Sequence, residues 1–90
     1  MNTEEQKEYW SKVTNWANER EKELEKINKD IFPSIWTDLQ CREYKISIWI
    51  GGGTRTIKET KKLAEDLVIV SQKLEESLKE MKEKFPYWKS

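Results

Sequence analysis

Two long stretches of this chain repeat their apolar side chains every three or four residues, and a short alternating segment separates them. The first stripe runs through Trp10, Val13, Ala17, Arg20, Leu24, Ile27 and Ile31. This spacing is typical of an amphipathic, heptad-like helix. Thr3 and Gln6 form a capping-box pattern at its start, and Pro33 stops it. We therefore predict a helix over residues 4–31.

The second stretch carries a clear start signal. Thr56 and Glu59 have the spacing of a capping box, so a helix is expected to begin at Ile57. Its apolar stripe continues through Ala64, Leu67, Val70, Leu74, Leu78, Met81 and Phe85. Pro86 ends the stripe, which predicts a helix over residues 57–85 and an aromatic tail over residues 86–90.

The segment between the two stripes carries the strand signal. In "EYKISIWIG", Tyr, Ile, Ile and Ile alternate with Lys, Ser and Trp, and this period of two favours a β-strand. Residues 35–56 are predicted to hold short strands with a turn at residues 51–53. The fold is thus predicted to be one α+β domain over residues 1–90, in which two long antiparallel α-helices flank a central antiparallel β-hairpin or three-stranded sheet (α-β-β-α).

The predicted core is thin, because 38% of the 90 residues are charged and 36% are hydrophobic. Small domains often compensate with disulfides, metals or oligomerisation. Cys41 is the only cysteine and there is no histidine, which excludes an intrachain disulfide and a structural zinc site. We therefore expect a homo-oligomer whose copies associate through the long helices.

The charge balance narrows the choice of partner. The 17 basic and 17 acidic residues cancel, whereas a general nucleic-acid-binding protein carries a basic excess. No stretch approaches the ~20 apolar residues of a membrane span. The first ten residues, "MNTEEQKEYW", lack the apolar run of a signal peptide. We expect a cytoplasmic protein with no membrane partner and no general nucleic-acid binding.

Antiparallel helices would bring aromatic residues from the two ends of the chain together. These residues are Tyr9, Trp10, Trp16, Phe85, Tyr87 and Trp88. They either cap the end of the core or form an interface with another chain, because Trp and Tyr dominate interface hot spots. Arg20 lies inside the first apolar stripe, where it either extends its charged end into water or pairs at the same interface.

All three glycines of the chain lie in "IGGGTRTI", and this run has two interpretations. As a hairpin turn, it joins "KISIWI" to "TRTI". As an anion site, it precedes a helix N-terminus, where backbone N–H groups and the helix dipole favour negative charge. A guanidinium and two hydroxyls would add donors suited to phosphate. The candidate ligand-binding residues are Gly51, Gly52, Gly53, Thr54, Arg55 and Thr56.

Three neighbours extend this candidate site. Trp49 precedes the glycines by two residues, and Arg42 and Lys45 flank the start of the same strand. An exposed Trp49 or Trp36 would stack on a base, whereas a buried one would pack under a long helix. A ligand that needs both phosphate donors and a stacking surface is a nucleotide.

Catalysis has little support in the sequence. The usual general base, histidine, is missing, and Asp38 and Glu43 are only two scattered carboxylates. We expect a non-enzymatic protein without metal or cofactor that sequesters a nucleotide signal, as a phage counter-defence factor would. One alternative is an inhibitor or adaptor that binds a host protein through Trp-rich helical faces. The other is a small metal-dependent phosphodiesterase.

Overall fold

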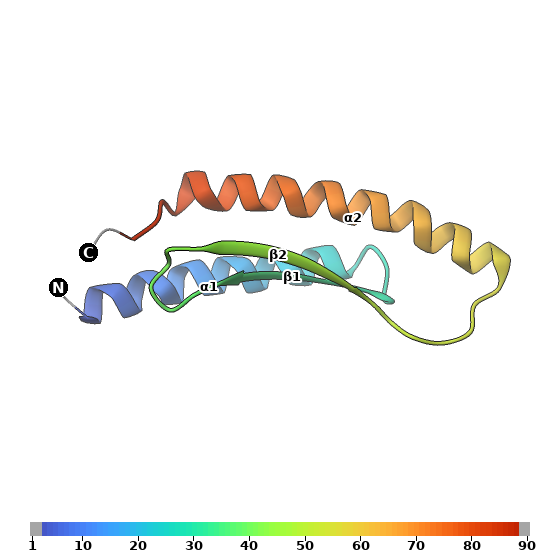
Figure 1. Cartoon of the computed structure of the whole chain (residues 1–90), viewed down its shortest axis with the longest axis horizontal. Coiled ribbons are helices and arrows are strands. Elements are labelled where there is room, and N and C mark those ends of the chain that lie inside the picture. The colour runs from blue at the N-terminus through green and yellow to red at the C-terminus, as the bar shows by residue number, and fades with distance from the viewer. Residues whose placement is uncertain (1–2, 89–90) are drawn as a thin grey trace.

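A computed structural model describes residues 3–88 and confirms the α+β fold (Figure 1). The elements follow the order α1 (Thr3–Glu25), β1 (Ile31–Thr37), β2 (Tyr44–Ile50) and α2 (Ile57–Lys84). The molecule measures 55 × 21 × 17 Å, and its radius of gyration of 15.6 Å exceeds the roughly 12 Å expected for a compact domain of this length. Residues 89–90 of the predicted tail lie outside the described part of the chain.

Helix α1 ends at Glu25, earlier than the predicted residue 31. The spacing of Ile27 and Ile31 continues the helical stripe, but a polar turn at Asn28 and Asp30 intervenes. The Asn28 side chain accepts a hydrogen bond from the Asp30 backbone N–H at 2.9 Å, which is the local turn that Asn favours over helix. The chain then extends directly into β1, so Ile31 opens a strand instead of closing a helix.

The two strands form one antiparallel hairpin, and its turn is not the glycine run. β1 and β2 pair with Ile31 opposite Ile50, Ser34 opposite Ser47 and Thr37 opposite Tyr44. The turn spans residues 38–43, where Asp38 Oδ1 accepts hydrogen bonds from the backbone of Arg42 and Glu43 at 2.8 and 3.1 Å. The predicted third strand in "TRTI" is absent from the described residues, so the glycine run joins β2 to α2 and the hairpin-turn interpretation was wrong.

Helix α2 confirms its predicted start. The Thr56 side chain accepts from the Glu59 N–H, and Glu59 accepts from the Thr56 N–H, which completes the capping box. The helix ends at Lys84, one residue before the predicted end, and the N–H of its C-cap Phe85 donates to Met81 O. No helix within residues 3–88 combines the length and the hydrophobicity needed to cross a bilayer.

The core lies between the helices and one face of the hairpin. The backbone of α1 lies against β1, and its Tyr9 side chain reaches Tyr44 of β2, whereas α2 lies against both strands. Alternation in β1 sends Ile31 and Ile35 into this core and leaves Phe32 and Trp36 on the opposite, exposed face. The buried hydrophobic residues are Val13, Ala17, Leu24, Ile31, Ile35, Cys41, Tyr44, Val70, Leu74 and Met81.

The two ends of the chain meet at one end of the molecule, as antiparallel helices predict (Figure 1). The ring of Tyr9 lies 6.1 Å from Phe85 and 5.1 Å from Trp88, and Trp16 lies 6.2 Å from Phe85. The Tyr9 hydroxyl donates to Pro86 O. The Tyr87 ring lies 5.0 Å from the Tyr44 ring and is tilted 54° relative to it. The predicted aromatic group therefore caps the core within one chain, and its role as an interface stays a prediction.

Candidate functional site

The glycine loop, which we define as residues 51–56, contains the ligand-binding residues that the sequence predicted. The Gly51 N–H donates to Asp30 O at 2.8 Å, which extends the hairpin ladder by one pair. Gly53 has a φ of 128°, a backbone conformation that residues with a Cβ rarely adopt. Gly52, Gly53 and Thr54 are exposed. Their backbone groups are therefore accessible to a ligand.

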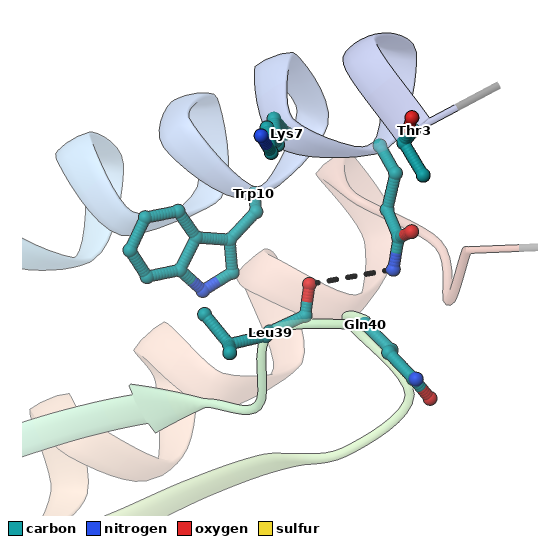
Figure 2. A pocket seen from close by; sticks show the side chains of 6 residues that line it. Thr3, Lys7, Trp10, Leu39 and Gln40 are labelled. Atoms are coloured by element: carbon teal, nitrogen blue, oxygen red, sulfur yellow. Dashed lines mark hydrogen bonds between the residues drawn. The ribbon is translucent and has the colours of Figure 1, made fainter.

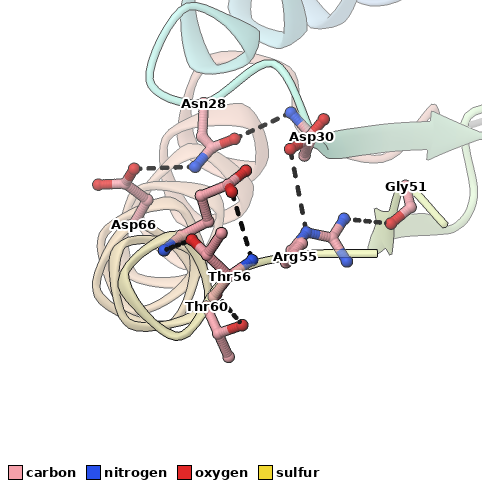
Figure 3. Close-up of polar contacts among 8 residues, drawn as sticks. Asn28, Asp30, Gly51, Arg55, Thr56, Thr60 and Asp66 are labelled. Carbon is pink, nitrogen blue, oxygen red and sulfur yellow. Dashed lines mark hydrogen bonds and ion pairs between the residues drawn. The ribbon is translucent and has the colours of Figure 1, made fainter. Parts of the chain in front are cut away.

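Arg55 does not extend into solvent toward a ligand. Its Nη2 donates to Gly51 O, and its Nε lies 4.0 Å from Asp30 Oδ2 (Figure 3). The side chain is only 18% exposed. Arg55 thus closes the loop against the start of β1, and this internal engagement competes with the predicted phosphate contact.

The N-terminus of α2 is also occupied from within the chain. The hydroxyl of Thr56 accepts from the Glu59 N–H at 3.1 Å. The Glu59 carboxylate in turn interacts with the Thr56 side chain and accepts from the Thr56 backbone N–H, and these hydrogen bonds hold the pKa of Glu59 below its usual range. A carboxylate therefore already sits where the helix dipole favours an anion. Of the predicted loop residues, Gly52, Gly53 and Thr54 keep the most accessible donors.

A buried carboxylate that sequence analysis missed supports this end of the molecule. Asp66 is 3% exposed. One of its oxygens accepts from Asn28 Nδ2 at 2.9 Å (Figure 3), and the other accepts from Lys62 Nζ at 3.0 Å. The hydrogen bond from Asn28 and then that from Lys62 lower the pKa of Asp66. The sequence did carry a signal for this contact. Asp66 lies four residues before Val70 and therefore on the apolar face of α2, where a buried acid needs a partner.

A cleft next to the Asn28–Asp66 hydrogen bond is lined by nearly equal numbers of positive and negative side chains. It encloses 440 Å³ and is lined by Asn28, Lys29, Asp30, Lys58, Glu59 and Lys62. Its three lysines face two carboxylates, and Lys62 is already paired with Asp66. The cleft therefore adds little net positive charge to the glycine loop.

The exposed face of the hairpin carries the aromatic part of the candidate site. Three cross-strand pairs form it, Phe32 with Trp49, Ser34 with Ser47 and Trp36 with Lys45, and we call these six residues the open face. Phe32, Trp36 and Trp49 are 47%, 49% and 71% exposed. Trp36 and Trp49 are thus exposed, which the sequence left undecided.

The open face separates the predicted ligand residues into two groups. Trp49 and Phe32 form one end, next to Gly51. Lys45 lies at the other end, with its Nζ 5.6 Å from the Trp36 ring centre and 3.3 Å from Glu43 Oε1. Arg42 is exposed in the adjoining turn. The two end pairs are four residue steps apart along the strands, which is about 13 Å at 3.3 Å per residue.

Arg20, predicted as an interface residue, pairs within the chain. Its Nη1 lies 2.7 Å from Glu80 Oε2 and 3.2 Å from Ser77 Oγ, and its guanidinium lies 4.8 Å from the Trp16 ring centre. These contacts join α1 to α2 and satisfy the charge that the apolar stripe carries. The hydrogen bond from Arg20 lowers the pKa of Glu80.

Trp10, another predicted interface residue, lines a small cleft between α1 and the hairpin turn. The cleft encloses 270 Å³ and is lined by Thr3, Gln6, Lys7, Trp10, Leu39 and Gln40 (Figure 2). The Gln6 side chain, which was predicted to close a capping box with Thr3, reaches across and donates to Leu39 O at 3.5 Å. The indole Nε1 of Trp10 is buried with no acceptor among the described residues.

The residues that the sequence suggested for metal binding are used in other ways. Residues 3–88 contain no set of three or more His, Cys, Asp or Glu side chains placed to hold a metal ion. Asp38 serves the hairpin turn through two backbone N–H groups. Cys41 is fully buried, and this burial is the main cause that raises the pKa of its thiol.

Comparisons of this chain with protein-family models, with curated proteins and with solved structures find no match.

Proposed function

We propose that this chain is a non-enzymatic binding protein that holds a flat, anionic ligand, a nucleotide, against the open face of the hairpin. The observation that carries the proposal is the exposure of Trp49, which is 71% accessible and stands next to the glycine loop. Large exposed aromatic surfaces on a small soluble protein usually serve recognition. Tryptophan presents a rigid face on which any base can stack.

The neighbours of Trp49 suit the remainder of a nucleotide. Phe32 lies directly opposite Trp49 across the strands and widens the stacking surface. The exposed backbone of residues 52–54 offers N–H groups to a phosphate. Lys45 supplies a cation at the far end of the open face. Arg55 has a structural task in this proposal, because Gly51 O and Asp30 engage its guanidinium.

The test is calorimetric titration with adenosine monophosphate, cyclic adenosine monophosphate and cyclic diadenylate. We expect at least one of them to bind, and we expect Trp49→Ala to weaken that binding by about tenfold to a hundredfold, because base stacking contributes about 1–3 kcal/mol. Leu39→Ala is the matched control, since Leu39 is also 71% exposed but lies in the hairpin turn. If none of the three nucleotides binds, or Leu39→Ala weakens binding as much, the proposal fails.

A protein ligand is the second candidate, and the length of the open face favours it. The aromatic residues occur at both ends of a surface about 13 Å long, which a single base does not span. An extended segment of a partner protein would contact both ends. Trp36→Ala separates the candidates, because it should weaken capture of a protein partner but leave mononucleotide binding at Trp49 within about twofold.

A further inference from the structure

The outer edge of β1 is closed to further strand pairing. The Ile31 N–H donates to Asn28 O at 3.1 Å, and Pro33 has no N–H to offer. The Ile35 N–H donates to Glu21 Oε1 at 2.7 Å. Proline, an added carboxylate and a covering helix are devices by which proteins protect an edge strand. The chain uses all three on this side of its sheet.

The outer edge of β2 has no proline and, within residues 3–88, no carboxylate that accepts from its backbone. Because Ile35 directs its N–H outward, the register makes the backbone groups of its partner Ile46 point outward as well. The same holds at every second residue, so Tyr44, Ile46, Ile48 and Ile50 present their N–H and C=O groups to this edge. Within residues 3–88, no hydrogen bond to these outward groups is found. β2 contains no proline, and its one charged residue, Lys45, belongs to the open face.

The core is also incomplete along the same edge. Ile31 and Ile35 of β1 are 1% and 6% exposed, whereas Ile46 and Ile48 are half-buried and Ile50 is 45% exposed. A groove of 280 Å³ follows this edge beneath α2 and is lined by Ile46, Ser47, Ile48, Ser71, Leu74 and Glu75. Apolar side chains and free backbone groups thus occur together, as they do where a strand is added to a sheet.

We propose that β2 pairs with β2 of a second copy of this chain, antiparallel, about a two-fold axis at Ser47. The result is one four-stranded sheet in the order β1-β2-β2-β1. In this register Tyr44 pairs with the partner's Ile50, and Ile46 pairs with the partner's Ile48. Each of the four outward residues then exchanges both backbone hydrogen bonds, which gives about eight across the interface.

This register pairs all four outward residues of β2 with outward residues of the partner's β2, and the neighbouring registers do not. Moving the axis to Ile46 leaves the outward groups of Ile50 unpaired, and moving it to Ile48 leaves those of Tyr44 unpaired. The axis at Ser47 places two small hydroxyl side chains face to face. It also places Lys45 opposite the partner's Trp49, and it keeps the two lysines about 13 Å apart along the strands. This complementarity identifies a second copy as the occupant.

The second copy would also complete the open face. Across the four strands, Phe32 and Trp49 would continue into the partner's Lys45 and the partner's Trp36. Two such rows, related by the axis, would flank a central row of serines. A ligand stacked on Trp49 would then lie beside a lysine from the other copy. This last step rests on the proposed function, whereas the strand pairing does not.

Sedimentation equilibrium of the ligand-free chain tests the pairing. We expect a dimer of twice the 10.9 kDa chain mass, and we expect Ser47→Lys to raise the dimer dissociation constant by about tenfold, because like charges would face each other at the axis. Ser34→Lys is the matched control, since Ser34 is the cross-strand neighbour of Ser47 on the same face but lies away from the axis. A mixture of Ser47→Lys and Ser47→Glu chains should recover the dimer.

Site-specific crosslinking provides the second measurement. Facing residues in a non-hydrogen-bonded pair have Cα atoms about 4.5 Å apart, which a disulfide can bridge. Ser47→Cys should therefore form a covalent dimer on mild oxidation, and Ser34→Cys should not. The proposal is overturned if the chain is monomeric up to millimolar concentration, or if Ser47→Lys dimerises as the wild type does. A dimer that binds no nucleotide would refute the proposed function alone.

Discussion

The backbone N–H of Ile35 donates to the carboxylate of Glu21, 2.7 Å away, and so attaches the outer edge of β1 to helix α1. The backbone of the same helix lies against β1 and away from β2. α1 therefore covers the outer edge of β1, while α2 lies against both strands. This asymmetry leaves β2 as the strand whose outer edge is accessible.

The Glu21 contact should contribute measurably to stability. Glu21→Ala leaves the Ile35 N–H without its acceptor, so we expect the free energy of unfolding to fall by about 1–3 kcal/mol. Urea denaturation monitored by circular dichroism measures the change. Glu19→Ala is the control, because Glu19 is an exposed acid on the same helix. Equal losses in the two variants would show that helix propensity, and not the edge contact, is responsible.

The glycine loop should respond very differently at two adjacent positions. A Cβ at Gly52 would meet nothing within 4 Å, whereas Gly53 has a φ of 128°. Gly53→Ala should therefore cost about 1–3 kcal/mol of stability through backbone strain. Gly52→Ala should be neutral or stabilising by up to about 1 kcal/mol, because it restricts the unfolded chain. Thermal unfolding of the two variants compares them, and similar melting temperatures would contradict the loop geometry.

Arg55 should act through Gly51 more than through Asp30. The Arg55–Asp30 pair is 4.0 Å apart and Asp30 is 45% exposed, so its coupling energy in a double-mutant cycle should stay below about 1 kcal/mol. Arg55→Ala should cost more than Asp30→Ala, because it also leaves Gly51 O without its donor. Urea denaturation of the two single variants and the double variant supplies the cycle. A larger coupling energy would assign the role of Arg55 to the ion pair instead.

Asp66 should make the protein sensitive to acid. Its folded pKa is lowered, mainly by the hydrogen bond from Asn28, so the unfolded chain, with an ordinary Asp pKa of about 3.9, takes up a proton first as the pH falls. The stabilisation is therefore complete above that pH and is lost as the pH drops through the folded pKa.

Asp66→Asn tests this origin. The stability difference between wild type and variant should be largest at neutral pH and should shrink toward about pH 2. Denaturant titrations across this range measure it, and Glu65→Gln, an exposed neighbour, controls for net charge. A difference that stays constant with pH would mean that the Asp66 carboxylate does not titrate as proposed.

Local patterns predicted β2 and α2 well because their signals are complete within a few residues. The capping box of Thr56 and Glu59 is a reciprocal contact over three positions, and it formed as predicted. The alternation of β2 likewise needs no distant partner. The start of β1 was harder to predict. Ile27 and Ile31 continue the helical spacing of α1, and Pro33 is equally typical of a residue that ends a helix. Proline fits β1 because its backbone nitrogen, which has no hydrogen to donate, points to the outer edge of the strand and away from β2.

The candidate site was less predictable, because it depends on contacts between distant segments. The sequence places Trp49 and Arg55 close together, but it does not say which of them is engaged within the chain. Arg55 is paired with Asp30, 25 positions earlier, and Trp49 is left exposed. Both faces of the two-stranded sheet carry large apolar residues, so alternation alone could not identify the covered face.

The meeting of the two chain ends bears on how fast the protein can fold. Tyr9 and Pro86 share a hydrogen bond although they are 77 positions apart, so the four elements form an almost closed ring. Cutting this ring at Gly52 and joining the ends by a short linker would give the order α2-α1-β1-β2. The two helices would then be consecutive, and their most distant pairing would become local. The contacts of α2 with β1 and β2, however, would become more distant in sequence than they are now. Because a higher contact order slows folding, this circular permutant should refold more slowly than the natural order.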